Sequence, residues 1–154
     1  MVTVRAVPAA ETLPLRQQVL RPHQTLDELR EPDDDTAASA SFVAVDGTGE
    51  VVGTGVVSRR PPPWTPAGDG DGWQVRAMAV APGQRGRGVG RAVLDALLAH
   101  VDAAGGDTVW CNARVPAAAF YERAGFTVVG EPFDLPDIGP HVVMTTRRPG
   151  PRPG

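Results

Sequence analysis

The chain has 154 residues, 42% of them hydrophobic, and a formal net charge of −3 at pH 7. This length suits one compact domain with a single core, and the negative charge argues against DNA or another polyanion as the main partner. No apolar run approaches the roughly 18 residues that a membrane-spanning helix requires, and no secretory signal pattern is visible at the N-terminus. We therefore expect a cytoplasmic protein without membrane contact, with one domain over residues 1–148 and a disordered tail over 149–154.

Hydrophobic patterning and turn residues predict alternating strands and helices along the chain. In chain order, we expect a strand over 2–7, a helix over 13–20, a second short helix, hairpin strands over 41–46 and 50–58, a central strand over 75–80, a helix carrying an apolar stripe over 93–101, a strand over 108–113, a helix of about nine residues from Pro116, and closing strands over 126–129 and 141–146.

The connecting segments carry their own signals. Thr25 and Glu28 have the spacing of a capping box for the second short helix. The acidic segment 31–35 follows, either as a solvated loop or as a lip that attracts a cationic amine. Glycine and proline exclude regular structure from 59–72. Between the closing strands, we expect Pro132, Pro136 and Pro140 to block strand pairing.

Neither cysteine nor histidine suggests a metal or a thiol nucleophile. Cys111 is the only cysteine and lies in an apolar strand, so we interpret it as a structural thiol. The three histidines are scattered without ligand spacing, and we predict no metal.

The segment 83–91 joins the central strand to the following helix through a turn rich in glycine and arginine. A helix start leaves its first backbone N–H groups without intrahelical partners and carries partial positive charge, so anions bind there. Glycines let the backbone approach a phosphate, and arginines add charge-assisted hydrogen bonds. The segment therefore predicts a diphosphate cradle.

Two familiar phosphate-binding loops do not fit this segment. The G-x-x-x-x-G-K-[ST] loop requires a lysine, and the chain contains none. The dinucleotide pattern G-x-G-x-x-G fails because the sixth residue is Arg91 when counted from Gly86 and Val93 when counted from Gly88.

The pattern that fits is R-x-x-G-x-G at Arg85, Gly88 and Gly90, and it resembles motif A of the GNAT acyltransferase superfamily. A second block, residues 110–126, is similar to motif B of the same superfamily. The resemblance covers roughly residues 40 to 146. It implies an α/β (α+β) GNAT fold, with a mixed, mainly antiparallel sheet of six or seven strands and about four helices.

The resemblance also implies an N-acetyltransferase that uses acetyl-CoA as co-substrate. Backbone groups of residues 78–80 would hold the pantetheine like an added strand, and an N–H there would polarise the thioester carbonyl. The cofactor-binding residues carried over from both motifs are Met78, Ala79, Val80, Arg85, Gly86, Arg87, Gly88, Val89, Gly90, Arg91, Asn112, Phe120 and Arg123.

Tyr121 occupies the motif B position of the general acid that protonates the departing thiolate in many relatives. The alternative is that Tyr121 only packs beside Phe120 on a short helix. Many relatives carry a glutamate base on the central strand, whereas residues 73–80 contain no carboxylate. A water-mediated base or a distant residue is left for that role.

Three further residues are candidates for contacting the acceptor. Strand alternation places Gln74 and Arg76 on one face, where the arginine either receives an acceptor carboxylate or forms a surface salt bridge. Segments 15–22 and 139–144 resemble the ElaA-like branch of the superfamily. Within the second segment, His141 is either a proton relay or substrate contact, or a histidine satisfied at a strand start.

The acceptor itself is not specified by the sequence. We expect a small-molecule or peptide amine, no nucleic-acid partner, and possible homodimerisation. A non-catalytic acyl-CoA sensor or regulatory module is the alternative function, because the cofactor motifs alone do not require turnover.

Overall fold

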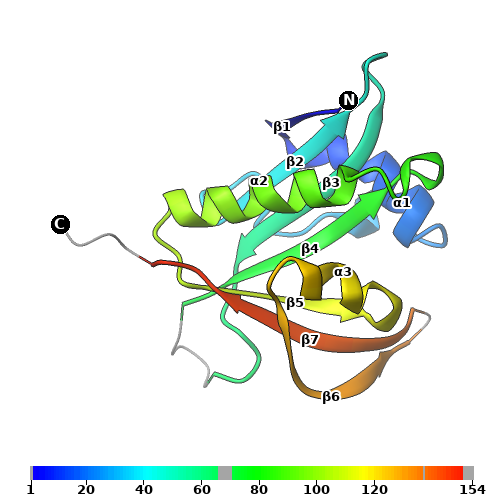
Figure 1. The fold of residues 1–154 in the computed structure, drawn as a ribbon. Coiled ribbons are helices and arrows are strands. Elements are labelled where there is room, and N and C mark those ends of the chain that lie inside the picture. Colours follow the sequence, from blue (N-terminus) through cyan, green and yellow to red (C-terminus); the bar gives the residue numbers. More distant parts are fainter. Residues whose placement is uncertain (1, 66–70, 137, 151–154) are drawn as a thin grey trace. The chain divides into compact units, whose positions relative to one another are not determined.

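The computed structural model describes residues 2–65, 71–136 and 138–150, which form seven strands, three α-helices and four short 3₁₀ turns (Figure 1). The strands are β1 (Thr3–Val7), β2 (Ser39–Val45), β3 (Val51–Arg59), β4 (Trp73–Val80), β5 (Thr108–Arg114), β6 (Thr127–Leu135) and β7 (Gly139–Arg147). The α-helices are α1 (Leu13–Leu20), α2 (Val89–Ala103) and α3 (Ala118–Arg123). The 3₁₀ turns are η1 (Ala9–Thr12), η2 (Asp27–Leu29), η3 (Pro82–Gln84) and η4 (Val115–Ala117).

Hydrogen bonding orders the strands β1-β2-β3-β4-β5-β7-β6. The β1–β2, β2–β3, β5–β7 and β6–β7 pairs are antiparallel, whereas β4 and β5 pair in parallel. The predicted mixed, mainly antiparallel sheet is therefore confirmed.

The chain divides into two compact units, which are described separately. Unit 1 consists of Met1–Arg59 and Arg76–His100, and unit 2 of Arg60–Val75 and Val101–Gly154. The prediction of a single domain over 1–148 stays a prediction. Of the predicted disordered tail, residues 151–154 lie outside the described residues.

In unit 1, α2 packs against the β2–β3 hairpin (Figure 1). Its predicted apolar stripe is buried: Val93, Leu94 and Leu97 are fully inaccessible. Close approach depends on glycine in β3, since a Cβ at Gly55 would lie 2.6 Å from Val93 Cγ1, and a Cβ at Gly53 would lie 2.7 Å from Val89 Cγ1. The two glycines thus set how closely the helix lies on the strand.

Strand β4 contains a backbone irregularity at Ala77, which has a φ of +58°. Side chains other than glycine rarely adopt this left-handed conformation because of steric strain. The buried Thr54 hydroxyl of β3 donates a 2.8 Å hydrogen bond to the Ala77 carbonyl. Packing and this bond hold the strand in a conformation that alternation along the sequence does not predict.

In unit 2, β5 pairs with β7 along its whole length, from Thr108↔Arg147 to Arg114↔His141. Helix α3 follows β5 through η4, so the predicted nine-residue helix consists of three 3₁₀ residues and six α-helical residues. Gly125, with a φ of +97°, ends it as predicted, and the Phe126 N–H donates to the Tyr121 carbonyl.

The closing strands are longer than predicted. Pro132 lies within β6 and Pro140 within β7, where Pro140 is opposite Asp134. The prediction that Pro132 and Pro140 block pairing is wrong. β6 is an edge strand, and its register shifts between Val129 and Phe133, so Pro132 falls where the ladder is already interrupted. Pro140 is opposite β6 alone, because the β5–β7 register ends at Arg114↔His141.

The hairpin prediction is confirmed, with β2 and β3 in register from Ser39↔Ser58. The capping box is confirmed too: Thr25 N–H donates to Glu28 Oε1 at 3.1 Å, and Glu28 N–H donates to Thr25 Oγ1 at 3.2 Å. The helix that it introduces is only the three-residue 3₁₀ turn η2.

Candidate active site

The glycine-rich loop before α2 has two glycines in the left-handed conformation directly before a helix start. Gly86 and Gly88 both have a φ of +79°, and a Cβ added at either would meet nothing within 4 Å. The Ala92 N–H donates to the Gly88 carbonyl, which makes this the first turn of a fifteen-residue helix. Val89 is buried, so its side chain anchors the start of α2. The first backbone N–H groups of a helix have no intrahelical partner.

The arginines of the loop divide into two groups. Arg85 and Arg87 are exposed, and no other described residue pairs with either. Arg91 is also exposed, but its Nε donates to Asp95 Oδ1 at 2.9 Å, which is the i,i+4 pair expected on the wet face of the helix. Of these three arginines, Arg85 and Arg87 are therefore the two whose charge is not paired with a described carboxylate.

Residues 78–80 end β4 next to this loop in the chain. Ala79 is buried, whereas Met78 and Val80 are partly exposed. The Ala81 N–H donates to the Val52 carbonyl of β3, which ties the end of the strand to its neighbour within unit 1.

The motif B residues lie in unit 2. Asn112 is exposed on β5, opposite Val143 of β7. Tyr121 is buried between two aromatic rings, with centroid distances of 5.1 Å to Phe120 and 5.4 Å to Phe126. Arg123 is exposed in the last turn of α3.

Burial also determines the acidity of Tyr121 and Cys111. Desolvation, and to a lesser degree the Cys111 thiol, raise the pKa of Tyr121 above its ordinary value. Desolvation raises the pKa of Cys111 to about 12. Cys111 is 1% exposed and therefore has the structural character that its sequence context indicates.

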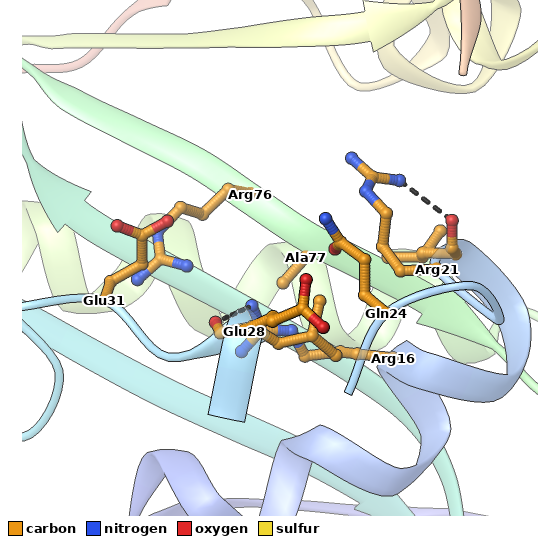
Figure 2. A pocket seen from close by; sticks show the side chains of 9 residues that line it. Arg16, Arg21, Gln24, Glu28, Glu31, Arg76 and Ala77 are labelled. Atoms are coloured by element: carbon orange, nitrogen blue, oxygen red, sulfur yellow. Dashed lines mark hydrogen bonds between the residues drawn. The ribbon is translucent and has the colours of Figure 1, made fainter. Parts of the chain in front are cut away.

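A pocket of about 310 Å³ lies within unit 1, and its lining residues include both charge signs. Figure 2 shows the side chains, which come from α1, the segment 21–31 and β4. The lining residues are Arg16, Leu20, Arg21, Gln24, Glu28, Leu29, Glu31, Arg76 and Ala77. Of these residues, Arg76 and Glu28 were predicted individually from the sequence, and Glu31 only as part of the acidic segment.

Arg16 is the least expected of these residues, because it is 6% exposed. Its Nη1 donates to Thr12 Oγ1 and its Nη2 to the Leu29 carbonyl, both at 3.2 Å. Desolvation, followed by the positive charge of Arg76, lowers the pKa of Arg16 to about 10, so it remains charged at neutral pH. The sequence contained a signal for this burial, because Arg16 follows Leu13 by three residues and the two therefore share one face of α1. The buried residues of this helix are Leu13, Leu15 and Arg16.

The acidic segment 31–35 is largely engaged by the protein itself. Asp34 Oδ1 accepts a 3.0 Å hydrogen bond from Arg76 Nη2, and Asp33 Oδ1 lies 3.8 Å from the same nitrogen. Asp35 Oδ1 accepts from the Ala9 N–H. Because the Asp34 side chain is only 8% exposed, the interpretation of a solvated loop is wrong for that residue.

The other two acceptor candidates lie in unit 2. Gln74 Oε1 accepts a 3.3 Å hydrogen bond from Arg60 Nη1. His141 is 3% exposed, its Nδ1 lies 2.8 Å from the Gly139 carbonyl oxygen, and its ring packs against Phe133. These contacts match the satisfied histidine that the sequence allowed as an alternative.

A family model for the acetyltransferase (GNAT) family matches residues 9–126. The chain belongs to the GNAT acetyltransferase family. It is therefore an acyltransferase, and GNAT enzymes use acetyl-CoA as acyl donor. Within this family it is 30% identical over 145 residues to a Bacillus subtilis (strain 168) protein named "Uncharacterized N-acetyltransferase YitI", covering 94% of this chain and 95% of that protein.

Solved structures of GNAT proteins share the fold. Escherichia coli ElaA matches with a TM-score of 0.74 at 19% identity, covering 94% of this chain and 99% of ElaA. An aminoglycoside 6′-N-acetyltransferase in complex with coenzyme A matches with a TM-score of 0.71 at 17% identity, covering 99% of both chains. At these identities the likeness concerns the fold, so membership of the ElaA-like branch stays a prediction.

Neither a membrane-spanning helix nor a metal-binding cluster is found among the described residues. None of the described helices has the length and apolar character needed to cross a bilayer. Within residues 2–65, 71–136 and 138–150, no group of three or more histidine, cysteine or acidic side chains is arranged to hold a metal ion.

Proposed function

We propose that this protein transfers an acetyl group from acetyl-CoA to a primary amine by direct attack within a ternary complex. The observation that carries the proposal is the cradle: two glycines with a φ of +79° at the start of α2, beside the exposed Arg85 and Arg87. Backbone amides and two arginines at a helix start match the charge and geometry of a diphosphate.

Each motif then has a role in holding the donor. The amides at 86–91, with Arg85 and Arg87, bind the diphosphate, and the backbone of residues 78–80 pairs with the pantetheine. Asn112, Phe120 and Arg123 are the motif B contacts to coenzyme A. Acetyl-CoA supplies an activated acyl group as a thioester, and the protein supplies orientation and hydrogen-bond donors.

In the reaction, the amine nitrogen bonds to the acyl carbon while the carbon–sulfur bond breaks, the amine loses a proton, and the thiolate gains one. We assign to Tyr121 the hydrogen bond that stabilises the departing sulfur. Full proton transfer from an ordinary tyrosine, with a pKa of about 10, to a thiolate of pKa about 8.5 is uphill by roughly 2 kcal/mol. Because burial raises the pKa of Tyr121 further, its hydroxyl acts as a hydrogen-bond donor to sulfur more readily than as a full acid.

We propose that the amine binds in the pocket of unit 1, called the acceptor pocket below, and that a water in this pocket removes its proton. The carboxylates that line the pocket are Glu28 and Glu31. Hydrogen bonds from Thr25 lower the pKa of Glu28, which weakens it as a base. The fraction of the acceptor in its neutral, reactive form therefore depends on the pH of the solution and on the pocket water. We expect turnover to rise with pH as the pH approaches the pKa of the acceptor amine.

The Tyr121→Phe variant tests the catalytic assignment, because it removes one oxygen and keeps the ring between Phe120 and Phe126. Acetyl-CoA binding is measured by calorimetry, and turnover by release of free thiol across a panel of amines. We expect affinity within about twofold of wild type and turnover reduced by about 10²-fold or more. Unchanged turnover would show that Tyr121 only packs in unit 2.

A non-catalytic acyl-CoA sensor is the second candidate function. The observation in its favour is that β4, Trp73–Val80, contains no carboxylate that could serve as base. Acetyl-CoA binding without thiol release for any amine in the panel would favour the sensor. Acceptor-dependent release would exclude it.

The acceptor of the aminoglycoside acetyltransferase is not carried over to this chain. A polycationic aminoglycoside would meet three arginines, Arg16, Arg21 and Arg76, in the lining of the pocket. We propose a small-molecule or peptide amine, a cytoplasmic location and, as in many members of the family, a possible homodimer.

A further inference from the structure

The pocket of unit 1 differs from an ordinary apolar ligand site because charged side chains dominate its lining. Arg16, Arg21 and Arg76 contribute positive charge, and Glu28 and Glu31 contribute negative charge (Figure 2). A ligand that enters must therefore satisfy charges of both signs, or leave some of them desolvated at a cost.

Arg76 is already compensated within the protein. Its Nη2 lies 3.0 Å from Asp34 Oδ1 and 3.8 Å from Asp33 Oδ1, and its Nε donates to Ser58 Oγ. A carboxylate ligand at Arg76 would compete with these two aspartates. Arg76 is consequently a poor anchor for an acceptor carboxylate.

Arg16 differs from Arg76 in its partners. Its two hydrogen bonds go to a hydroxyl and a carbonyl, both neutral, and no described carboxylate forms an ion pair with it. A guanidinium has five N–H donors, and the two hydrogen bonds of Arg16 use two of them, so others can donate to a ligand. A buried charge in this state is stabilised by a bound anion, which supplies both charge and lone pairs.

The geometry of Arg16 also suits a fixed ligand. Thr12 and the Leu29 carbonyl hold its guanidinium from two sides, so little side-chain entropy is lost when a ligand binds. Burial, and after it Arg76, lower the pKa of Arg16, whereas the charges of Asp34 and Glu31 raise it; a bound carboxylate would act in the same direction as these two.

The size of the pocket limits the ligand. A volume of about 310 Å³ lies at the lower end of the range of roughly 300–1,000 Å³ that small-molecule sites occupy. The pocket thus suits a small molecule of amino-acid size.

We propose that the acceptor is a small zwitterion, a primary amine that carries a carboxylate as a free amino acid does, with the carboxylate bound by Arg16. The glutamates in the lining attract the ammonium end, and the amine reacts on the side of Ala77, which joins the pocket to residues 78–80. This inference rests on the proposed acetyltransferase function, but its central statement concerns binding and can be tested without turnover.

The test compares each ligand with a twin that lacks the negative charge. Calorimetry measures binding of L-leucine, L-methionine, L-glutamate and L-lysine, and of their C-terminal amides, to the full chain with and without coenzyme A. We expect at least one amino acid to bind about 10- to 100-fold more tightly than its amide, the loss typical of one charged hydrogen-bond pair.

Three variants assign this preference to Arg16. Arg16→Gln should abolish the difference between acid and amide, and Arg16→Lys should restore part of it, because lysine keeps the charge but not the planar fork. Arg5→Gln is the matched control: Arg5 is a cation of unit 1 that pairs with Glu11 and does not line the pocket. Thermal melting checks that each variant folds.

The outcomes separate the inference from the proposed function. A carboxylate preference that depends on Arg16 supports the inference even if no thiol is released, in which case the acetyltransferase proposal alone fails. If Arg16→Gln does not fold, the acid–amide comparison on wild type decides. Equal binding of acids and amides, binding of neither, or an unchanged preference in a folded Arg16→Gln protein would overturn the inference.

Discussion

Gly88→Ala isolates the contribution of backbone conformation to the cradle. Gly88 has a φ of +79°, and an added Cβ would meet nothing within 4 Å, so the substitution introduces conformational strain and no clash. The left-handed conformation costs an L-residue about 1–2 kcal/mol. For a chain of this length, that cost lowers the melting temperature by about 2–8 °C.

The chain offers a matched control in the turn between β2 and β3. Gly49 has a φ of +87° and equally empty surroundings, so Gly49→Ala should lower the melting temperature by a similar amount. The two variants differ in one respect: only Gly88 precedes α2 at the predicted diphosphate site. Any difference in acetyl-CoA affinity between them therefore reports on the cradle.

The expected affinity follows from the same strain energy. If the loop of the Gly88→Ala variant relaxes from the left-handed conformation, acetyl-CoA must restore it, and the same cost of about 1–2 kcal/mol weakens binding by about 5- to 30-fold. Calorimetric titration with acetyl-CoA measures this loss, while Gly49→Ala should bind as wild type does. Strain that the free protein retains lowers its stability, whereas strain that it relieves weakens binding. Wild-type affinity in Gly88→Ala without the expected loss of stability would therefore refute the reasoning that this loop holds the diphosphate.

Two further predictions concern the interiors of the units. Gly55→Ala places a Cβ 2.6 Å from Val93 Cγ1, and we expect it to lower the free energy of unfolding by about 1–3 kcal/mol in chemical denaturation. In the control Gly47→Ala the Cβ meets nothing within 4 Å, so this substitution should be neutral or slightly stabilising. Equal effects of the two substitutions would mean that α2 does not pack tightly on β3. Burial raises the pKa of Cys111 to about 12. The thiol of the native protein should therefore resist iodoacetamide at about pH 8 and react once urea unfolds the chain. Rapid labelling of the native protein would show that this thiol of β5 is accessible.

Elements with strong periodicity were predictable from the sequence. The stripe of α2 recurs every three to four residues, and Val93, Leu97 and Val101 are all fully buried. The β2–β3 hairpin and the helix end at Gly125 follow from local turn residues, which act within a few positions of the chain. Each of these signals is contained in the segment that it shapes.

The errors arose where tertiary context overrides local preference. Pro132 and Pro140 indicated a loop, yet the edge strand β6 accommodates Pro132 at a register shift, and Pro140 lies in β7 just beyond the end of its pairing with β5. Nothing in an alanine predicts the φ of +58° at Ala77, because the conformation depends on the neighbouring strand and on Thr54.

The candidate site was predictable in part for a similar reason. The cradle is one continuous segment, so its glycines and arginines were visible in the sequence. The acceptor pocket is assembled from α1, the segment after it, and β4, and its central residue Arg16 is a basic side chain on the buried face of a short helix. Only the fold reveals that Arg16 and Arg76, sixty positions apart, line one pocket.

The left-handed residue in β4 has a consequence for how the two substrates of such an enzyme are linked. Ala77 lines the acceptor pocket, and the next residue begins the segment proposed to hold the donor. Consecutive Cα atoms are about 3.8 Å apart, so neighbouring peptide groups of one strand would contact the donor and the acceptor. A substitution that moves this strand to suit a new amine will also move the donor, and acceptor preference is therefore better altered at Arg16 or Gln24, on segments that lie outside β4.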